Sequence, residues 1–179
     1  MRIGGPSAFV AALVTVGATV VAGGQSAADA RLQGQLKQLF PAATAFSAKE
    51  GDPPHYKAYV GDPAKKTLGG YAFWTTELEP LERAYDGPIK MIVGMDTKGV
   101  LTGIVVVEHH EPYGYFSVDL PAFAIQFRNK DIRDPFRVGS DIDAISRASI
   151  SVTSASRAVR NSARRMARQY LAPPESPKQ

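Results

Sequence analysis

The chain has 179 residues, of which 44% are hydrophobic and 21% are charged, and its formal net charge is +4. These values are typical of one folded domain and exclude both wholesale disorder and a protein with many membrane spans. Most of the positive surplus lies in one arginine-rich stretch near the C-terminus, so we expect no nucleic-acid binding. The absence of cysteine excludes disulfides and iron–sulfur clusters ligated by the chain's own thiolates. Redox chemistry would therefore need an organic cofactor.

The N-terminal thirty residues have the pattern of a secretory signal. Arg2 is followed by an alanine- and valine-rich apolar run over 8–22, and then by small residues that include the cleavage-type triplet 28–30. The apolar run is short for a membrane span, which favours cleavage over an uncleaved N-terminal anchor. Either way we expect a periplasmic protein, soluble or N-terminally anchored. The predicted organisation is a signal peptide over 1–30, one domain over 31–171 and a disordered tail over 172–179.

The first part of this domain is expected to contain one helix and two strands. Leu32, Leu36, Leu39 and Phe40 recur at helical spacing before Pro41, which predicts a short amphipathic helix. Residues 41–54 are interpreted as a loop. Strands are predicted over 55–60 and 69–76.

The clearest local pattern is a β-hairpin over 87–109. Two apolar, β-branched runs flank the turn sequence Asp-Thr-Lys-Gly at 96–99. Alternate residues of the first run are apolar and share one side of the strand, namely Ile89, Met91, Val93 and Met95. We expect this hairpin at the centre of an antiparallel sheet.

The C-terminal part is predicted to be helical at two places. A short helix is expected over 120–127, and a polar, turn-rich stretch follows over 129–143. Over 152–170 apolar residues recur every three or four positions, and arginines mark the opposite face, which is typical of an amphipathic helix. The arginine face is either simply solvated or a docking surface. The predicted fold class is a single α+β domain: an antiparallel sheet packed by helices, with a C-terminal amphipathic helix.

Small hydroxyl residues gather where the last helix is expected to begin, at Ser146, Ser149, Ser151 and Thr153. Unpaired amides and the positive end of the helix dipole make such a place suitable for a phosphate. The alternative is that these side chains only cap the helix. The physical pattern permits a phosphate site and leaves both interpretations open.

The segment 143–149, with the sequence Asp-Ala-Ile-Ser-Arg-Ala-Ser, resembles the flavin-attachment motif of FMN-binding domains, Asp-x-x-Ser/Thr-Gly-Ala-Thr. In this family a flavin transferase of the ApbE type modifies the final hydroxyl residue, which corresponds to Ser149. The resemblance implies FMN as the cofactor, esterified to Ser149, with a cofactor-binding set of Asp143, Ser146, Arg147, Ala148, Ser149 and Ser151.

Two positions depart from the family pattern. Arg147 stands where the motif has glycine, and Ser149 where it has threonine. A serine hydroxyl forms the same phosphoester. Arginine is less favourable than glycine if φ is positive there, and it either obstructs the transferase or pairs with the flavin phosphate. Noncovalent FMN and loss of the cofactor are the alternatives to the ester.

Further segments extend the resemblance over nearly the whole mature chain. They are similar to the periplasmic flavin domain that opens NosR/NirI-type accessory proteins of nitrous oxide reduction, and to RnfG/NqrC flavin domains. They comprise Leu39-Phe40-Pro41, 51–54, 87–89, 93–96, 102–104, the Val-Glu-His-His-Glu-Pro run at 107–112 and 134–139.

This resemblance implies an electron-transfer domain more than a stand-alone enzyme, service in denitrification, and a separate membrane or periplasmic redox partner. The alternatives are a periplasmic regulatory or assembly factor and a cofactor-free binding module.

Two further residue groups carry weaker expectations. The run Glu108-His109-His110-Glu111 could suggest a metal, but adjacent side chains point to opposite sides on a strand, so we predict no metal site and a structural or pocket-lining role. Several aromatic residues either flank a flavin ring or belong to the core: Tyr71, Phe73, Trp74, Tyr113, Tyr115 and Phe116.

Overall fold

A computed structural model describes Met1 and residues 23–171 of the chain. Most of the predicted signal peptide and the whole of the predicted tail lie outside the described residues. The elements follow one another as α1 (Gly23–Leu39), β1 (Ala43–Phe46), β2 (Tyr56–Val60), β3 (Thr67–Trp74), α2 (Thr75–Leu78), β4 (Lys90–Asp96), β5 (Leu101–Glu108), the 3-10 turn η1 (Gly114–Phe116), α3 (Pro121–Ile125) and α4 (Ser149–Tyr170). In this part of the chain no helix is long and apolar enough to cross a membrane.

The five strands form one antiparallel sheet in the order β1-β2-β3-β4-β5. Each strand pairs with the strand that follows it in the sequence, so no connection crosses over another strand. The predicted hairpin is present as β4 and β5, which pair from Lys90↔Glu108 to Met95↔Leu101. The α+β class, the antiparallel sheet and the C-terminal helix are confirmed.

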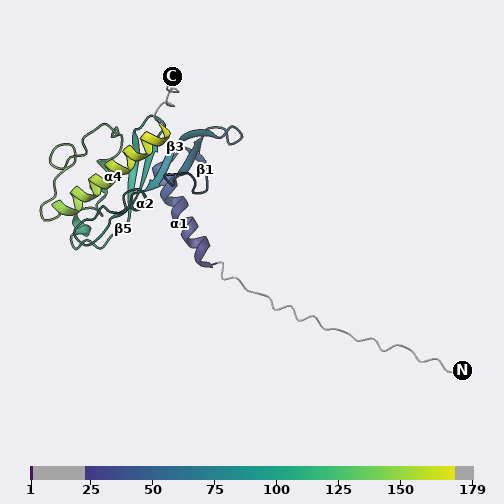
Figure 1. Cartoon of the computed structure of the whole chain (residues 1–179), viewed down its shortest axis with the longest axis horizontal. Helices are drawn as coiled ribbons and strands as arrows, with labels where there is room; N and C mark the ends of the chain where they lie inside the picture. Colours follow the sequence, from purple (N-terminus) through teal and green to yellow (C-terminus); the bar gives the residue numbers. More distant parts are fainter. Residues whose placement is uncertain (2–22, 172–179) are drawn as a thin grey trace, which may run out of the picture.

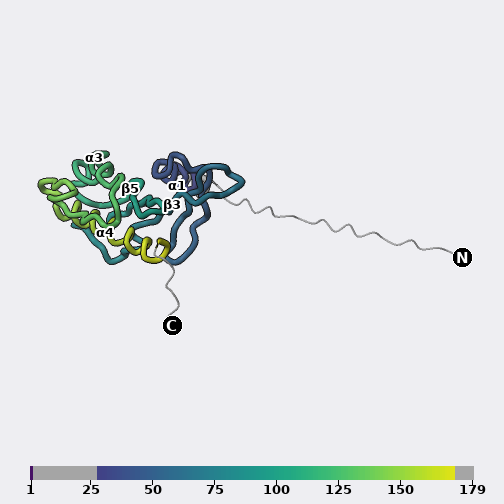
Figure 2. Tube along the Cα trace, turned by 90° about the horizontal axis from the view of Figure 1, so that it is seen from above, coloured from purple at the N-terminus to yellow at the C-terminus, as the bar shows by residue number. Residues whose placement is uncertain are grey.

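The sheet separates two apolar layers. On one face α4 covers a large core that includes Phe73, Met91 and Val93, and on the other face α1 covers a smaller cluster around Leu36 and Ile92. Figures 1 and 2 show α1 and α4 on opposite sides of the strands. Adjacent residues such as Ile92 and Val93 are both buried because successive side chains of a strand face opposite layers.

Helix α1 approaches the sheet closely where the strands carry glycine. A Cβ on Gly94 would lie 3.1 Å from the Cβ of Leu39, and one on Gly70 would lie 2.7 Å from a ring carbon of Phe40 and 2.4 Å from the backbone oxygen of Met95. Side chains at these two positions would hold the helix away from the sheet. The glycines therefore permit the tight packing of this layer.

Three sequence predictions need correction. Residues 43–46, interpreted as part of a loop, form β1, because backbone pairing with β2 stabilises a strand too short to show a pattern of its own. The hairpin is not central: β5 is an edge strand and β3 is the middle one, since β1 and β2 both add to the far side. The first helix begins at Gly23, upstream of the predicted start at residue 31.

Helix α4 has the expected apolar face. Val152, Ala155, Val159, Ala163 and Met166 are all buried in the larger core. The arginines of α4 do not only contact solvent, because several of them bond to neighbouring segments of the chain. Arg157 pairs with Glu82 at 2.7 Å, Arg164 donates to the carbonyls of Ile132 and Asp134, and Arg165 donates to that of Leu78.

Candidate functional site

A tight turn leads into α4. The amide of Ala148 donates to the carbonyl of Ile145 at 3.1 Å, which places Ser146 and Arg147 at the two central positions. Arg147 has a φ of 67°, whereas Ser146 is not among the residues with positive φ. A positive φ at the second central residue alone defines a type II turn, whose third residue is usually glycine. The turn geometry therefore explains why the family motif has glycine where this chain has arginine.

The N-terminus of α4 has no side-chain cap. The cap position is held by Ala148, which is 2% exposed, and no described side chain bonds to the first-turn amides. The Ser151 hydroxyl donates to Glu111 instead. The alternative in which the serines serve as caps is therefore wrong, and the free amides of the first turn leave an anion-binding position at Ser149.

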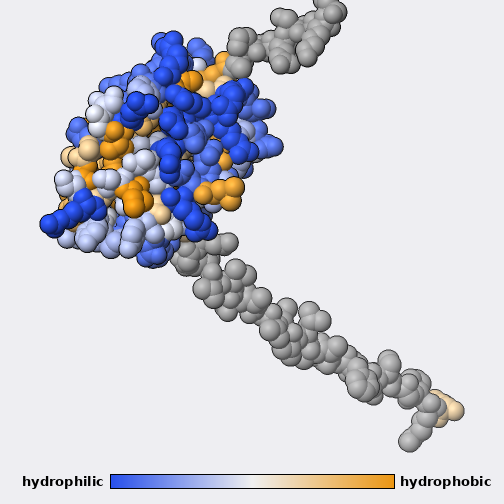
Figure 3. All heavy atoms as spheres, turned by 60° about the vertical axis from the view of Figure 1, so that its left-hand side comes forward, coloured by the Kyte–Doolittle hydropathy of each residue, from blue (hydrophilic) through white to orange (hydrophobic). Residues whose placement is uncertain are grey.

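A cavity of about 500 Å³ opens at this helix start. Three segments line it: Tyr85 from one loop, Pro112 and Tyr113 from another, and 147–151 from the turn and α4. Its volume is within the usual range for small-molecule sites. Ser149 is exposed at this cavity, as are the side chains of Tyr85, Tyr113 and Ile150. Figure 3 shows hydrophobic patches on the face toward the start of α4.

A buried carboxylate lies behind the cavity wall. Glu111 is 6% exposed and accepts hydrogen bonds from the amides of Tyr85 at 3.2 Å and Asp86 at 2.8 Å, as well as from the Ser151 hydroxyl. Its own amide donates to Nδ1 of His109 at 3.1 Å. The other ring nitrogen of His109 lies 2.8 Å from the carboxylate of Asp119.

The residues named from the motif are placed as follows. Arg147, Ala148, Ser149 and Ser151 all line the cavity. Asp143 and Ser146 are exposed and are not among the lining residues. The amide of Asp143 donates to the side chain of Gln126 at 2.7 Å, which ties the motif segment to the end of α3.

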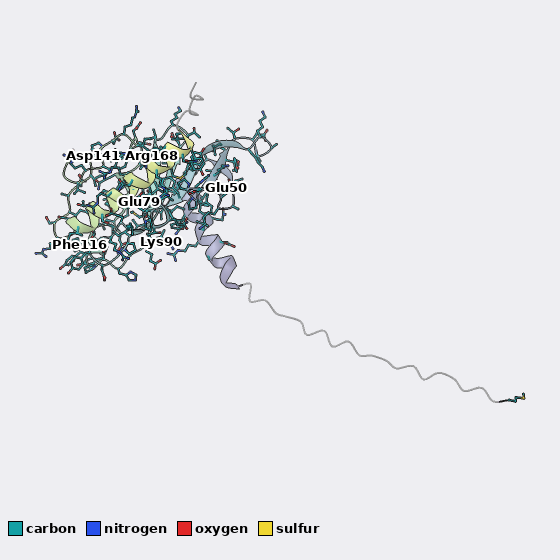
Figure 4. The ribbon with its side chains drawn as sticks, viewed as in Figure 1. Glu50, Glu79, Lys90, Phe116, Asp141 and Arg168 are labelled. Atoms are coloured by element: carbon teal, nitrogen blue, oxygen red, sulfur yellow. The ribbon has the colours of Figure 1, made fainter. Side chains whose placement is uncertain are left out.

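The aromatic residues separate into core and cavity. Tyr71 and Phe73 belong to the larger core, and Trp74 packs in the cluster under α1. Tyr113 lines the cavity, and Tyr115 contacts Phe116. In Figure 4 Phe116 lies near the start of α4, and Arg168 lies toward its other end.

Sequence reasoning missed Tyr85 altogether, and it missed the burial of Glu111 and the partners of its carboxylate. The Glu-Pro dipeptide at 111–112 is part of the family likeness, but nothing local indicates that its carboxylate is buried. That burial depends on partners at 85–86 and at Ser151, which are far away in the sequence.

The electrostatics of the cavity combine one exposed cation with the helix terminus. Arg147 makes no ion pair with the residues that the structure describes. Its guanidinium is therefore available to an anionic ligand at Ser149. The cavity also has aromatic walls, so fold and site together define a domain suited to a phosphorylated aromatic ligand.

Comparison with known proteins identifies this ligand class. Residues 84–164 match the family model of the FMN-binding domain. The matched segment includes Tyr85, Glu111, Arg147 and Ser149, and so covers every segment of the cavity. This match confirms the resemblance to FMN-binding domains seen in the sequence.

Two groups of relatives are similar to the chain. A component of the ion-translocating oxidoreductase complex of Haemophilus influenzae is 39% identical over 67 residues, which cover 34% of this chain and 30% of the relative. The regulatory protein NosR of Pseudomonas aeruginosa is 33% identical over 129 residues, covering 66% of this chain and 17% of the relative. NosR of Stutzerimonas stutzeri is 33% identical over 105 residues, covering 58% and 13%. The chain thus spans less than a third of these relatives.

Proposed function

We propose that this chain is an exported flavoprotein domain that carries FMN as a phosphoester on Ser149 and relays electrons to or from a separate redox partner. The observation that supports the ester most directly is the position of Ser149. Its side chain is exposed at the cavity, on the first residue of a helix with no side-chain cap. A hydroxyl in this place is accessible for modification, and the adjacent amides favour a phosphate.

The residues of the cavity fit FMN in two respects. The first-turn amides of α4 and the guanidinium of Arg147 offset the negative charge of the phosphate. Tyr85 and Tyr113 offer aromatic surface to a flat ring. FMN when bound supplies a ring that accepts one or two electrons, so no side chain of this chain need act as acid, base or nucleophile.

Maturation of the proposed ester requires a second protein. A flavin transferase of the ApbE type would join the FMN phosphorus to the Ser149 oxygen, so that the product is heavier than the chain by one FMN less one water. The type II turn holds Ser149 immediately after the buried Ala148. The hydroxyl is thus presented at the surface while the preceding residue anchors the turn in the core.

Electron relay is supported by the names of the relatives. One group belongs to an oxidoreductase complex, and the presence of an FMN-binding domain agrees with that role. We propose a membrane or periplasmic redox partner, a periplasmic location for this domain and service in nitrous oxide respiration.

A second candidate function is regulatory. The relatives from Pseudomonas aeruginosa and Stutzerimonas stutzeri are named regulatory proteins. In this role the flavin state or a partner contact would control another process. A carrier must be reduced and reoxidised repeatedly by its partners, whereas a regulator need not turn over, so stopped-flow measurement of both half-reactions discriminates the two.

The decisive experiment is intact mass spectrometry of the chain exported together with a flavin transferase. We expect a mass increase of one FMN less one water in the wild type and in Ser140→Ala, a control that removes an exposed hydroxyl outside the 143–149 motif. The increase should vanish in Ser149→Ala. An unmodified wild type would exclude the ester, and an unmodified, colourless protein would also contradict FMN carriage.

A further inference from the structure

Glu111 is a buried acidic side chain without a cationic partner. It is 6% exposed, and it takes part in none of the ion pairs among the described residues. Burial of a lone carboxylate is unfavourable unless hydrogen bonds replace its hydration. Three donors do so here: the amides of Tyr85 and Asp86 and the hydroxyl of Ser151.

These bonds connect all three segments that form the cavity. One carboxylate oxygen accepts from Asp86, and the other accepts from both Tyr85 and Ser151. Pro112 and Tyr113 follow Glu111 directly in the chain. The carboxylate therefore links the loop of Tyr85, the loop of Tyr113 and the first turn of α4.

The backbone of Glu111 is fixed in turn by His109. Because Nδ1 of His109 accepts the Glu111 amide, its proton lies on Nε2, which donates to Asp119. Hydrogen bonds to the backbone and to the side chain of Glu111 thus connect Asp119 at the surface with Ser151 at the cavity. The backbone of Glu111 is thus held by His109, and its carboxylate is held by Tyr85, Asp86 and Ser151.

We propose that Glu111 is the positioning residue of the FMN cavity: it holds the two tyrosine-bearing loops at a fixed distance from the flavin-accepting start of α4. This inference rests on the proposed FMN function and deepens it. An apolar residue would fill the same space without a desolvation penalty, but it would not join the three segments. The carboxylate is suited to this task because its two oxygens accept several bonds at once.

The inference is tested with the full chain made without a flavin transferase, so that FMN binds noncovalently. Glu111→Gln keeps the shape but loses the charge and one acceptor oxygen. Ser151→Ala keeps the carboxylate and removes its link to α4. The matched control is Ser156→Ala, a buried serine of the same helix that donates only to the carbonyl of Val152.

Three quantities are measured: amide hydrogen exchange at Tyr85 and Asp86 without FMN, the Kd for FMN, and the visible spectrum of bound FMN. In Glu111→Gln we expect exchange at these amides to accelerate, the Kd to rise about tenfold or more, and the spectrum to shift, because bonds to a charged acceptor are lost. In Ser151→Ala the Kd should rise several-fold while exchange at both amides is unchanged. Ser156→Ala should match the wild type in all three.

The possible failures can be distinguished. If the wild type binds FMN but Glu111→Gln matches it in exchange, Kd and spectrum, Glu111 does not position the cavity. If Glu111→Gln fails to fold, Ser151→Ala still decides, because equality with Ser156→Ala excludes a link between the carboxylate and α4. A wild type that binds no FMN contradicts the proposed function itself, whatever the exchange at Tyr85 and Asp86.

Discussion

Arg147 adopts a φ of 67° two residues before Ser149, the residue at which α4 begins. The left-handed backbone at Arg147 lets the chain turn sharply and start the helix with an exposed hydroxyl. For a residue with a Cβ this conformation is strained by about 1–2 kcal/mol. The strain lies inside the segment proposed to receive the flavin.

Replacement of Arg147 by glycine should therefore stabilise the protein. We expect Arg147→Gly to raise the free energy of unfolding by about 1 kcal/mol, which corresponds to an increase in Tm of about 2–4 °C. Arg147→Ala is the matched control, since it removes the guanidinium but keeps the Cβ and the strain. Thermal unfolding of the three proteins measures the effect, and equal Tm values for Arg147→Gly and Arg147→Ala would contradict it.

The same two variants separate strain from charge. Both lack the guanidinium, so both should bind noncovalent FMN several-fold more weakly than the wild type if Arg147 pairs with the phosphate. The difference should diminish at high salt, because the guanidinium is exposed. Fluorescence titration at two ionic strengths measures it, and an unchanged Kd in both variants would rule out the pairing.

The tyrosines of the cavity should contribute to flavin binding. Tyr85→Ala or Tyr113→Ala should each weaken FMN binding by about 0.5–1.5 kcal/mol and reduce the quenching of flavin fluorescence, because each removes an aromatic wall. Tyr115→Ala serves as control, since Tyr115 is 70% exposed and does not line the cavity. A larger effect at Tyr115 than at Tyr85 and Tyr113 would show that the ring lies elsewhere.

Elements with strong local periodicity could be predicted from the sequence. The hairpin has β-branched strands around a four-residue turn, and α4 has apolar residues at helical spacing, so each carries its own signal. Strand β1 has only four residues, and it forms because β2 offers backbone partners. The order of strands in the sheet, which moves the hairpin away from the centre, depends on that unpredicted strand.

The site was predictable to the extent that it is local. The segment 143–149 indicated the helix start, and the family motif has glycine at the position of Arg147, where the structure has a positive φ. The contribution of Tyr85 and the burial of Glu111 arise from contacts between segments that are distant in the sequence. The sequence around Tyr85 and the sequence around Glu111 contain no local pattern that would predict a contact between distant segments.

Gly70 in β3 and Gly34 in α1 should respond in opposite directions to an added Cβ. Gly70→Ala should destabilise the protein by about 1–3 kcal/mol, because the new Cβ would lie 2.4 Å from the rigid backbone oxygen of Met95. Gly34 lies within α1 and has nothing within 4 Å of such a Cβ. Gly34→Ala should therefore stabilise the helix by about 0.5–1 kcal/mol. Urea unfolding of both variants checks the sign of each effect.

Acid should weaken the loop that precedes the flavin motif. Burial by itself would raise the pKa of Asp141, but hydrogen bonds from Lys130 and from the amides of Arg137 and Phe136 outweigh it and lower this pKa. Phe136 is 2% exposed and has a φ of 50°, so the Asp141 carboxylate stabilises a strained, buried residue.

Because the pKa of Asp141 is lower in the folded state, its contribution is complete above the unfolded value of about 3.9 and is lost as the pH falls through the folded value. Asp141→Asn should therefore be less stable than the wild type by about 1–3 kcal/mol at pH 7, and the difference should diminish below pH ~3.9.

Asp131→Asn is the control for this prediction. Arg133 lowers the pKa of Asp131 to about 2, but the Arg133 side chain of this pair is 85% exposed, so its contribution to stability is small. Urea unfolding of the three proteins from pH 2 to 7 measures these differences, and a gap for Asp141→Asn that is constant with pH would show that the charge of Asp141 is not what stabilises the loop.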